Sequence, residues 1–92
     1  MACFPRRADH DRVPRLSSVV ASNIRAERAR RHWDQTELGR RIGWSRSTVS
    51  AIESGQRKIT LDHLAPLCRA FGIPLTKLTE GADPEDLRVL GF

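Results

Sequence analysis

The residues best suited to chemistry lie in one short stretch, Ile42 to Gly55, with the sequence IGWSRSTVSAIESG. It carries five serine or threonine hydroxyls and one arginine, Arg46. Hydroxyls donate and accept hydrogen bonds, and such short side chains let another molecule approach the backbone closely. A helix that only covers a core carries long helix formers on its exposed side. We therefore interpret this stretch as a contact surface for another molecule.

Catalysis and metal binding are not predicted. No serine, histidine and acid have an interpretable spacing, and no glycine-rich phosphate loop is present. Cys68 and His63 lack further ligands at zinc-site spacing. Cys68 instead lies on an apolar stripe, which predicts a buried structural thiol. We expect a protein without enzyme activity, cofactor or metal.

The charge is unevenly distributed. Residues 16–58 carry nine Arg or Lys and four acids, whereas residues 59–92 carry three basic and five acidic residues. A local basic region favours a polyanionic partner, most often nucleic acid, although a merely solvated arginine-rich surface is the alternative.

Size and composition indicate one small soluble domain. The chain has 92 residues, is 39% hydrophobic and contains only two cysteines, which are far apart. We expect reduced thiols, a cytoplasmic, nucleoid-associated location, and no membrane span or secretory signal.

The periodicity predicts an all-α fold with five short helices and a possible sixth. Apolar residues from Leu16 to Ile24 recur at helical spacing and indicate a helix ending near His32, with Arg25, Arg30 and Arg31 in water. Asp34, Ser45 and Thr60 are expected to cap the next three helices, which end at Gly43, Gly55 and Gly72. In the fourth helix, the residues expected to face inward are Leu61, Leu64, Leu67, Cys68 and Phe71. IPLTKL predicts a short turn, and DPEDLRVL resembles a helix start.

Two local features qualify this pattern. Pro66 falls inside the fourth helix, so the helix either begins near His63 or is kinked. The three-residue link GWS cannot run its two helices antiparallel and sets them at a steep angle, as in a helix-turn-helix.

Gly39 is expected to be small because the third helix crosses close to it. Trp33 and Trp44 are expected to pack in the core.

The segment from Ile24 to Leu78 resembles the lambda-repressor-like helix-turn-helix family, of the Cro or xenobiotic-response-element type. The resemblance rests on Ile24 and Arg28, then on QTEL, IGWSRSTVSAIESG and LDHLAPLCRAFGIPLTKL. Trp33, Trp44, Gly39 and Pro66 depart from the usual pattern. The resemblance implies a five-helix bundle whose third helix enters the DNA major groove.

The resemblance also assigns roles to residues. Arg46 is the best candidate for reading a base, because a guanidinium can bond both N7 and O6 of guanine. The other candidates for base contact are Ser47, Ser50 and Ala51. The candidates for phosphate contact are Gln35, Ser45, Ser54, Gln56, Arg57 and Lys58. Arg28 and Glu53 are implied to form a structural ion pair between the first and third helices.

We expect three segments: a flexible basic arm over residues 1–15, a DNA-binding domain over 16–79, and a tail or short helix over 80–92. Such proteins usually act as homodimers on palindromic double-stranded DNA, as transcriptional regulators such as repressors. The apolar tail either contacts a second copy or folds back over its own bundle. Two alternatives stay open: an antitoxin whose arm or tail binds a protein partner, and a protein-binding adaptor that uses the same fold.

Overall fold

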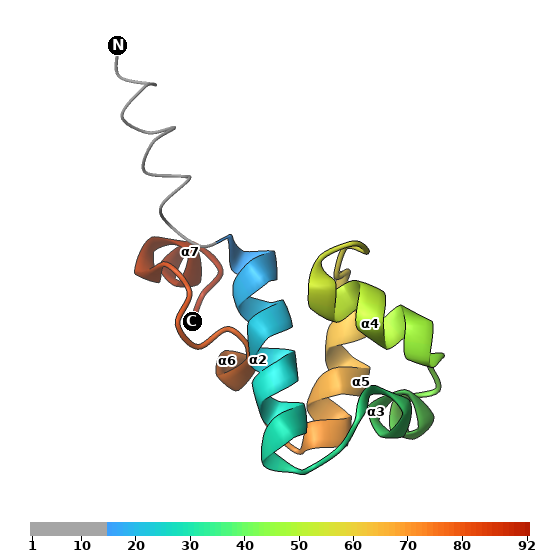
Figure 1. The fold of residues 1–92 in the computed structure, drawn as a ribbon. Helices are drawn as coiled ribbons and strands as arrows, with labels where there is room; N and C mark the ends of the chain where they lie inside the picture. Colours follow the sequence, from blue (N-terminus) through green and yellow to red (C-terminus); the bar gives the residue numbers. More distant parts are fainter. Residues whose placement is uncertain (1–14) are drawn as a thin grey trace.

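In the computed structural model, which describes residues 15–92, six α-helices follow one another and these residues form no strand (Figure 1). The helices are α2 (Leu16–Arg30), α3 (Gln35–Ile42), α4 (Arg46–Ser54), α5 (Leu61–Phe71), α6 (Leu75–Leu78) and α7 (Pro84–Val89). The predicted all-α class is confirmed, and the possible sixth helix is present as α7. Most of the predicted arm lies outside the described residues.

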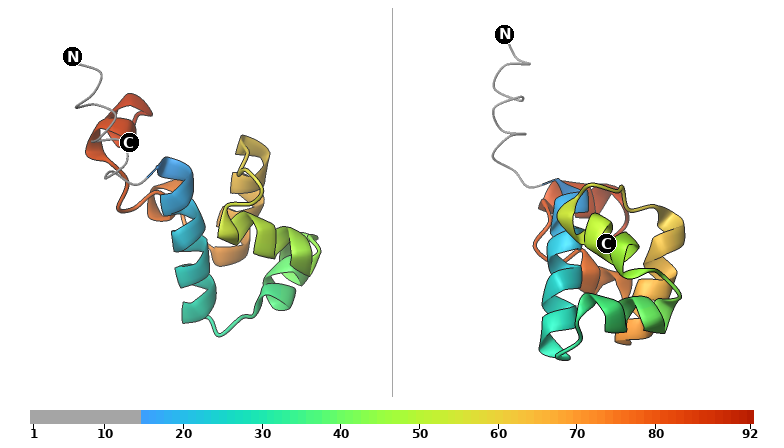
Figure 2. Two further views of the ribbon diagram at one scale, coloured as in Figure 1. Left: turned by 45° about the horizontal axis from the view of Figure 1, so that its top comes forward. Right: turned by 45° about the vertical axis from the view of Figure 1, so that its right-hand side comes forward.

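The helix α2 runs through the middle of the bundle. Helices α3 and α4 lie on one side of it and α6 and α7 on the other, while α5 contacts α2, α3 and α6 (Figure 1; Figure 2, left view). None of the helices in the described part of the chain is long and apolar enough to cross a membrane.

One apolar core joins five of the helices. Its most deeply buried side chains are Ile24, Leu38, Val49, Ile52, Leu67 and Leu78. The predicted inner faces are confirmed except at Leu61, which is 84% exposed. Leu61 is the first residue of α5 and lies beyond the edge of the core, which α5 reaches only from Leu64 onward.

The helix-turn-helix is fixed by two caps and two glycines. The Asp34 carboxylate accepts the Glu37 N–H at 2.7 Å, and the Ser45 hydroxyl accepts the Thr48 N–H at 3.2 Å. Gly43 has a φ of +80°, which glycine adopts without strain. A Cβ at Gly39 would lie 2.4 Å from the Trp44 carbonyl oxygen. The close approach that requires glycine therefore comes from the turn before α4 rather than from α4 itself.

Helix α5 starts at Leu61 and runs through Pro66, so the alternative start near His63 is wrong. The Thr60 N–H donates to Nδ1 of His63 at 3.1 Å, which satisfies a backbone donor in the first turn. The His63 ring meets the Trp44 ring edge to face, with centroids 5.0 Å apart. Trp33 stacks on Phe71, and both tryptophans pack against the core as predicted.

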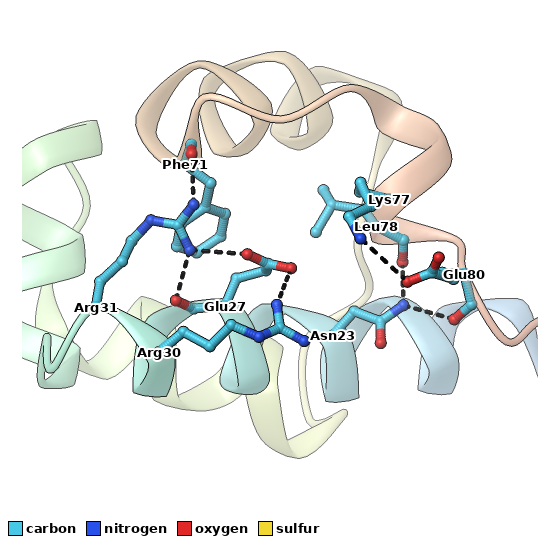
Figure 3. Close-up of polar contacts among 8 residues, drawn as sticks. All are labelled: Asn23, Glu27, Arg30, Arg31, Phe71, Lys77, Leu78 and Glu80. Carbon is cyan, nitrogen blue, oxygen red and sulfur yellow. Dashed lines mark hydrogen bonds and ion pairs between the residues drawn. The ribbon is translucent and has the colours of Figure 1, made fainter.

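Polar contacts attach α2 to the C-terminal half of the chain (Figure 3). The buried Glu27 carboxylate pairs with Arg30 and, at 2.8 Å, with Arg31, and Arg31 also donates to the Phe71 carbonyl oxygen at 2.6 Å. The Asn23 amide donates to the carbonyl oxygens of Leu78 and Glu80. Placing Arg31 in water was therefore wrong, because this guanidinium bridges α2 and the end of α5.

Candidate nucleic-acid interface

Helix α4 presents one open face and one buried face. Val49 and Ile52 are buried, whereas Arg46 and Ser47 in its first turn are exposed and Ser50 and Ala51 are half-buried. The four residues expected to contact bases thus all keep some accessible surface, and the first turn is the most open part of the helix.

The hydroxyls at the start of α4 form a connected group. The Ser45 oxygen lies 3.1 Å from the Ser47 oxygen and 2.9 Å from the Thr48 oxygen. The Arg57 guanidinium, from the loop after α4, lies 3.4 Å from the Thr48 oxygen. The chain reversal at Gly55 thus brings Arg57 back toward the first turn of α4. Thr48 was not among the predicted contact residues, although its position three residues after the cap Ser45 was a usable signal.

An ion pair holds α4 against α2. Nε of Arg28 lies 2.8 Å from one Glu53 oxygen and its Nη2 lies 3.0 Å from the other, in bidentate geometry. The Glu53 side chain is 2% exposed. A buried carboxylate needs such a partner, and Arg28 fixes the angle between the two helices.

The side chain of Gln35, a candidate for phosphate contact, is turned toward the Arg28–Glu53 ion pair. It donates to Glu53 Oε1 at 3.2 Å and is half-buried. The backbone N–H of Gln35, in the first turn of α3, has no partner within the helix and stays a candidate donor for an external anion.

The loop after α4 is open to solvent. Ser54, Gln56, Arg57 and Lys58 are all exposed. The Ser54 hydroxyl donates to the Ala51 carbonyl oxygen at 3.2 Å, so it is partly occupied within α4.

The cations fall into two groups. Of the thirteen Arg and Lys side chains in residues 15–92, seven pair with a carboxylate of the same residues. The six without such a pair are Arg15, Arg25, Arg46, Arg57, Lys58 and Arg69. Five of these six, all but Arg69, lie on α4, in the loop after it or along the cleft beside it. Positive charge not neutralised by the described part of the chain therefore gathers around α4.

Paired charges dominate elsewhere. The Glu37 carboxylate accepts hydrogen bonds from Arg40 and Arg41 at 2.6 and 2.7 Å. These bonds lower the pKa of Glu37, and the bond from Arg40 has the largest effect.

Burial raises the pKa of the free Cys68 thiol, which is half-buried rather than fully buried. Within residues 15–92, no three His, Cys, Asp or Glu side chains gather where they could hold a metal ion.

The fold and this site define a helix-turn-helix domain, and the comparisons agree. A family model described as helix-turn-helix matches residues 24–78. The chain therefore belongs to the helix-turn-helix family of the lambda-repressor and Cro type.

Three similar proteins or structures illustrate this family. A hypothetical transcription factor of Neisseria meningitidis serogroup B is 35% identical over 63 residues, which are 68% of this chain and 59% of that protein's length. The crystal structure of the Neisseria hypothetical transcription factor NHTF is similar, with a TM-score of 0.68 and 31% identity over 85% of this chain and 91% of that one. The clp gene regulator ClgR from Corynebacterium glutamicum has a TM-score of 0.65 at 25% identity, over 71% of this chain and 84% of that one.

Proposed function

We propose that this protein is a transcriptional regulator that binds double-stranded DNA in a sequence-dependent way. Helix α4 enters the major groove, and its first turn contacts base edges. The observation that carries the proposal is the open first turn of α4, with Arg46 exposed and without a carboxylate partner among the described residues. The relatives described as a transcription factor and a gene regulator support it.

The length and the hydrogen-bonding groups of each side chain on α4 determine the contact that we assign to it. Arg46 bonds N7 and O6 of a guanine, the commonest specific contact in the major groove. Ser47 and Ser50 bond bases or phosphates, and the Ala51 methyl contacts a thymine methyl. None of these residues is buried, so binding needs no rearrangement of the core.

Phosphate contacts hold the helix in register. Arg57 and Lys58 bind the backbone on one side of α4 together with Ser54 and Gln56. Ser45 binds it at the start of α4, and the Gln35 N–H binds it at the start of α3. Backbone contacts of this kind position a protein without reading sequence.

Two copies bind a palindromic site. One helix reads only a few base pairs, so a two-fold dimer with half-sites one turn apart supplies the remaining specificity. An apolar groove lined by Leu16, Val20, Leu64 and Leu75 supports a contact between copies. Leu61, Leu90 and Phe92 also line it and are at least 47% exposed. A two-fold dimer that covers this groove would remove these apolar side chains from water.

Selection of bound duplexes from a random DNA pool at near-physiological salt tests the proposal. We expect a recovered palindrome with guanines about one helical turn apart. A pool that stays random, with binding lost steeply as salt rises, means that only phosphates are held. That outcome would reject sequence-dependent reading and direct the search to a protein partner, as in the antitoxin and adaptor alternatives.

A further inference from the structure

A cleft separates the start of α2 from the end of α4. Its volume is about 360 Å³, and it is bounded on the α2 side by Arg15, Ser17, Ser18, Ala21 and Arg25. The other wall runs from Ile52 to Gly55 and continues through Arg57, Lys58 and Ile59. In the ribbon of Figure 1, the start of α2 and the end of α4 both lie toward the top of the molecule.

The cleft is strongly positive. Arg15, Arg25, Arg57 and Lys58 all line it, and within residues 15–92 none of them pairs with a carboxylate. Its one acid is Glu53, whose carboxylate is 2% exposed and is bonded to Arg28 and Gln35. The Arg25 guanidinium donates to the Glu53 carbonyl oxygen, which carries no net charge to offset it.

We propose that this cleft binds a phosphate of the DNA backbone beyond the base pairs that α4 reads. Arg15, the residue before α2, and Arg25 on α2 supply positive charge, and the exposed hydroxyls of Ser17 and Ser18 supply hydrogen bonds. This inference rests on the proposed function, because the same DNA must occupy α4 and the cleft. It adds α2 to the DNA-binding surface, a helix to which the sequence assigned no DNA contact.

A DNA backbone fits the cleft better than a free small anion for one reason. Two lining residues, Arg57 and Lys58, belong to the exposed loop proposed to hold the backbone beside α4. A strand bound at that loop passes the mouth of the cleft, so its next phosphates lie within reach of Arg15. Each phosphate neutralised in this way releases counterions and steepens the salt dependence of binding.

The test uses a random-sequence duplex, since phosphate contacts do not depend on sequence, and measures affinity at several salt concentrations. Arg15→Ala removes one cation from the cleft, and Ser18→Glu adds one anion. Their matched controls are Arg88→Ala on α7 and Ala26→Glu on the exposed side of α2, which change net charge equally. Arg15 makes no side-chain cap bond, and α2 has no acid in its first turn. Neither cleft variant should therefore unfold the protein, since an acid near a helix N-terminus is favourable.

We expect Arg15→Ala to reduce the salt slope by about 0.9 and to weaken binding about eightfold at 0.1 M salt. Ser18→Glu should weaken binding further while its thermal midpoint stays at or above that of the unmodified protein. The two controls should bind like the unmodified protein.

Two results would overturn the inference. If the cleft variants match their controls while Arg57→Ala weakens binding, the cleft is not a phosphate site, although the proposed function survives. If the unmodified protein shows no salt-dependent binding to any duplex, the proposed function fails, and the cleft assignment fails with it.

Discussion

At the scale of single residues, Arg46 and Arg57 have the same chemistry and different positions. Arg46 opens α4, whereas Arg57 lies in the loop and is 3.4 Å from Thr48. We expect Arg46→Ala to cost about 1–3 kcal/mol of binding free energy at the selected site and to relax base preference there. Titrations against the selected duplex and against random DNA measure this difference.

Arg57→Ala should instead weaken binding to all sequences alike and lower the salt slope by about one. The same titrations, repeated at several salt concentrations, check this expectation. If both variants changed specific and random binding equally, the division into base reading and phosphate binding would be wrong.

The Arg28–Glu53 ion pair stabilises the fold, since it joins α2 and α4. Glu53→Gln keeps the shape of the side chain but leaves the Arg28 guanidinium without its carboxylate at the α2–α4 contact. We expect a loss of about 3 kcal/mol in the free energy of unfolding, the lower end for a broken buried pair. Arg28 itself is 19% exposed, which moderates the effect.

Urea unfolding measures this loss, with Glu37→Gln as the control. Glu37 also pairs with arginines, but on the surface, where solvent screening leaves such pairs with little effect on stability. Equal losses for the two variants would contradict the assignment of Glu53 as a buried structural acid.

At the scale of elements, the turn between α3 and α4 rests on Gly43. A side chain there meets nothing within 4 Å, so the positive φ alone resists substitution. We expect Gly43→Ala to lower the free energy of unfolding by about 1–2 kcal/mol. Gly43→Asn should lose less, because asparagine tolerates this conformation better. Thermal unfolding of both variants checks the order, and an equal loss would point to a packing role.

Protonation of Glu27 at low pH should weaken the contact that joins α2 to the end of α5. The hydrogen bond from Arg31, with help from Arg30, lowers the pKa of its carboxyl below 4.5 despite burial. Because the pKa is lower in the folded state, the stabilisation is complete above the ordinary glutamate pKa and is lost as the pH falls from there through the lower pKa of folded Glu27. We expect the Glu27→Gln variant to have a lower free energy of unfolding at pH 7 and to lose less of that free energy on acidification. Urea unfolding at several pH values tests this, and parallel pH profiles would contradict it.

At the scale of the whole molecule, the apolar groove and its exposed leucines predict self-association. Leu90 borders the groove and is 56% exposed. Burying one leucine contributes about 1.5–3 kcal/mol, so Leu90→Ser should raise the dimer dissociation constant roughly tenfold or more. Sedimentation over a range of concentrations measures it, with Ala26→Ser as the control. A protein that stays monomeric at all concentrations would leave the groove without this role.

Local sequence patterns predicted most of the fold. Capping residues such as Asp34 and stop glycines such as Gly43 act within a few residues of their position, so they can be recognised in one sequence. Leu61 shows the limit of this reasoning. Its spacing fits the apolar stripe of α5, but the edge of the core is set by neighbouring helices that spacing does not describe.

Residues of the candidate site that follow a local sequence signal were predicted, whereas residues brought to it by the packing of helices were missed. Arg46 and Ser47 follow the cap of α4 directly and are exposed as expected. Outside the site, the i,i+4 spacing of Glu27 and Arg31 was a readable signal for an ion pair that was not predicted. Arg25 had no such signal, because α4 is what turns its helix face into a cleft wall.

The division of α4 into a buried and an open face has an evolutionary consequence. Val49 and Ile52 are buried and anchor the helix in the bundle, while Arg46 is exposed and makes no side-chain hydrogen bond or ion pair within residues 15–92. Exposed substitutions of this kind usually change stability by less than about 0.5 kcal/mol. Under the proposed function, a substitution at position 46 can therefore change the target sequence without compensating changes in the core.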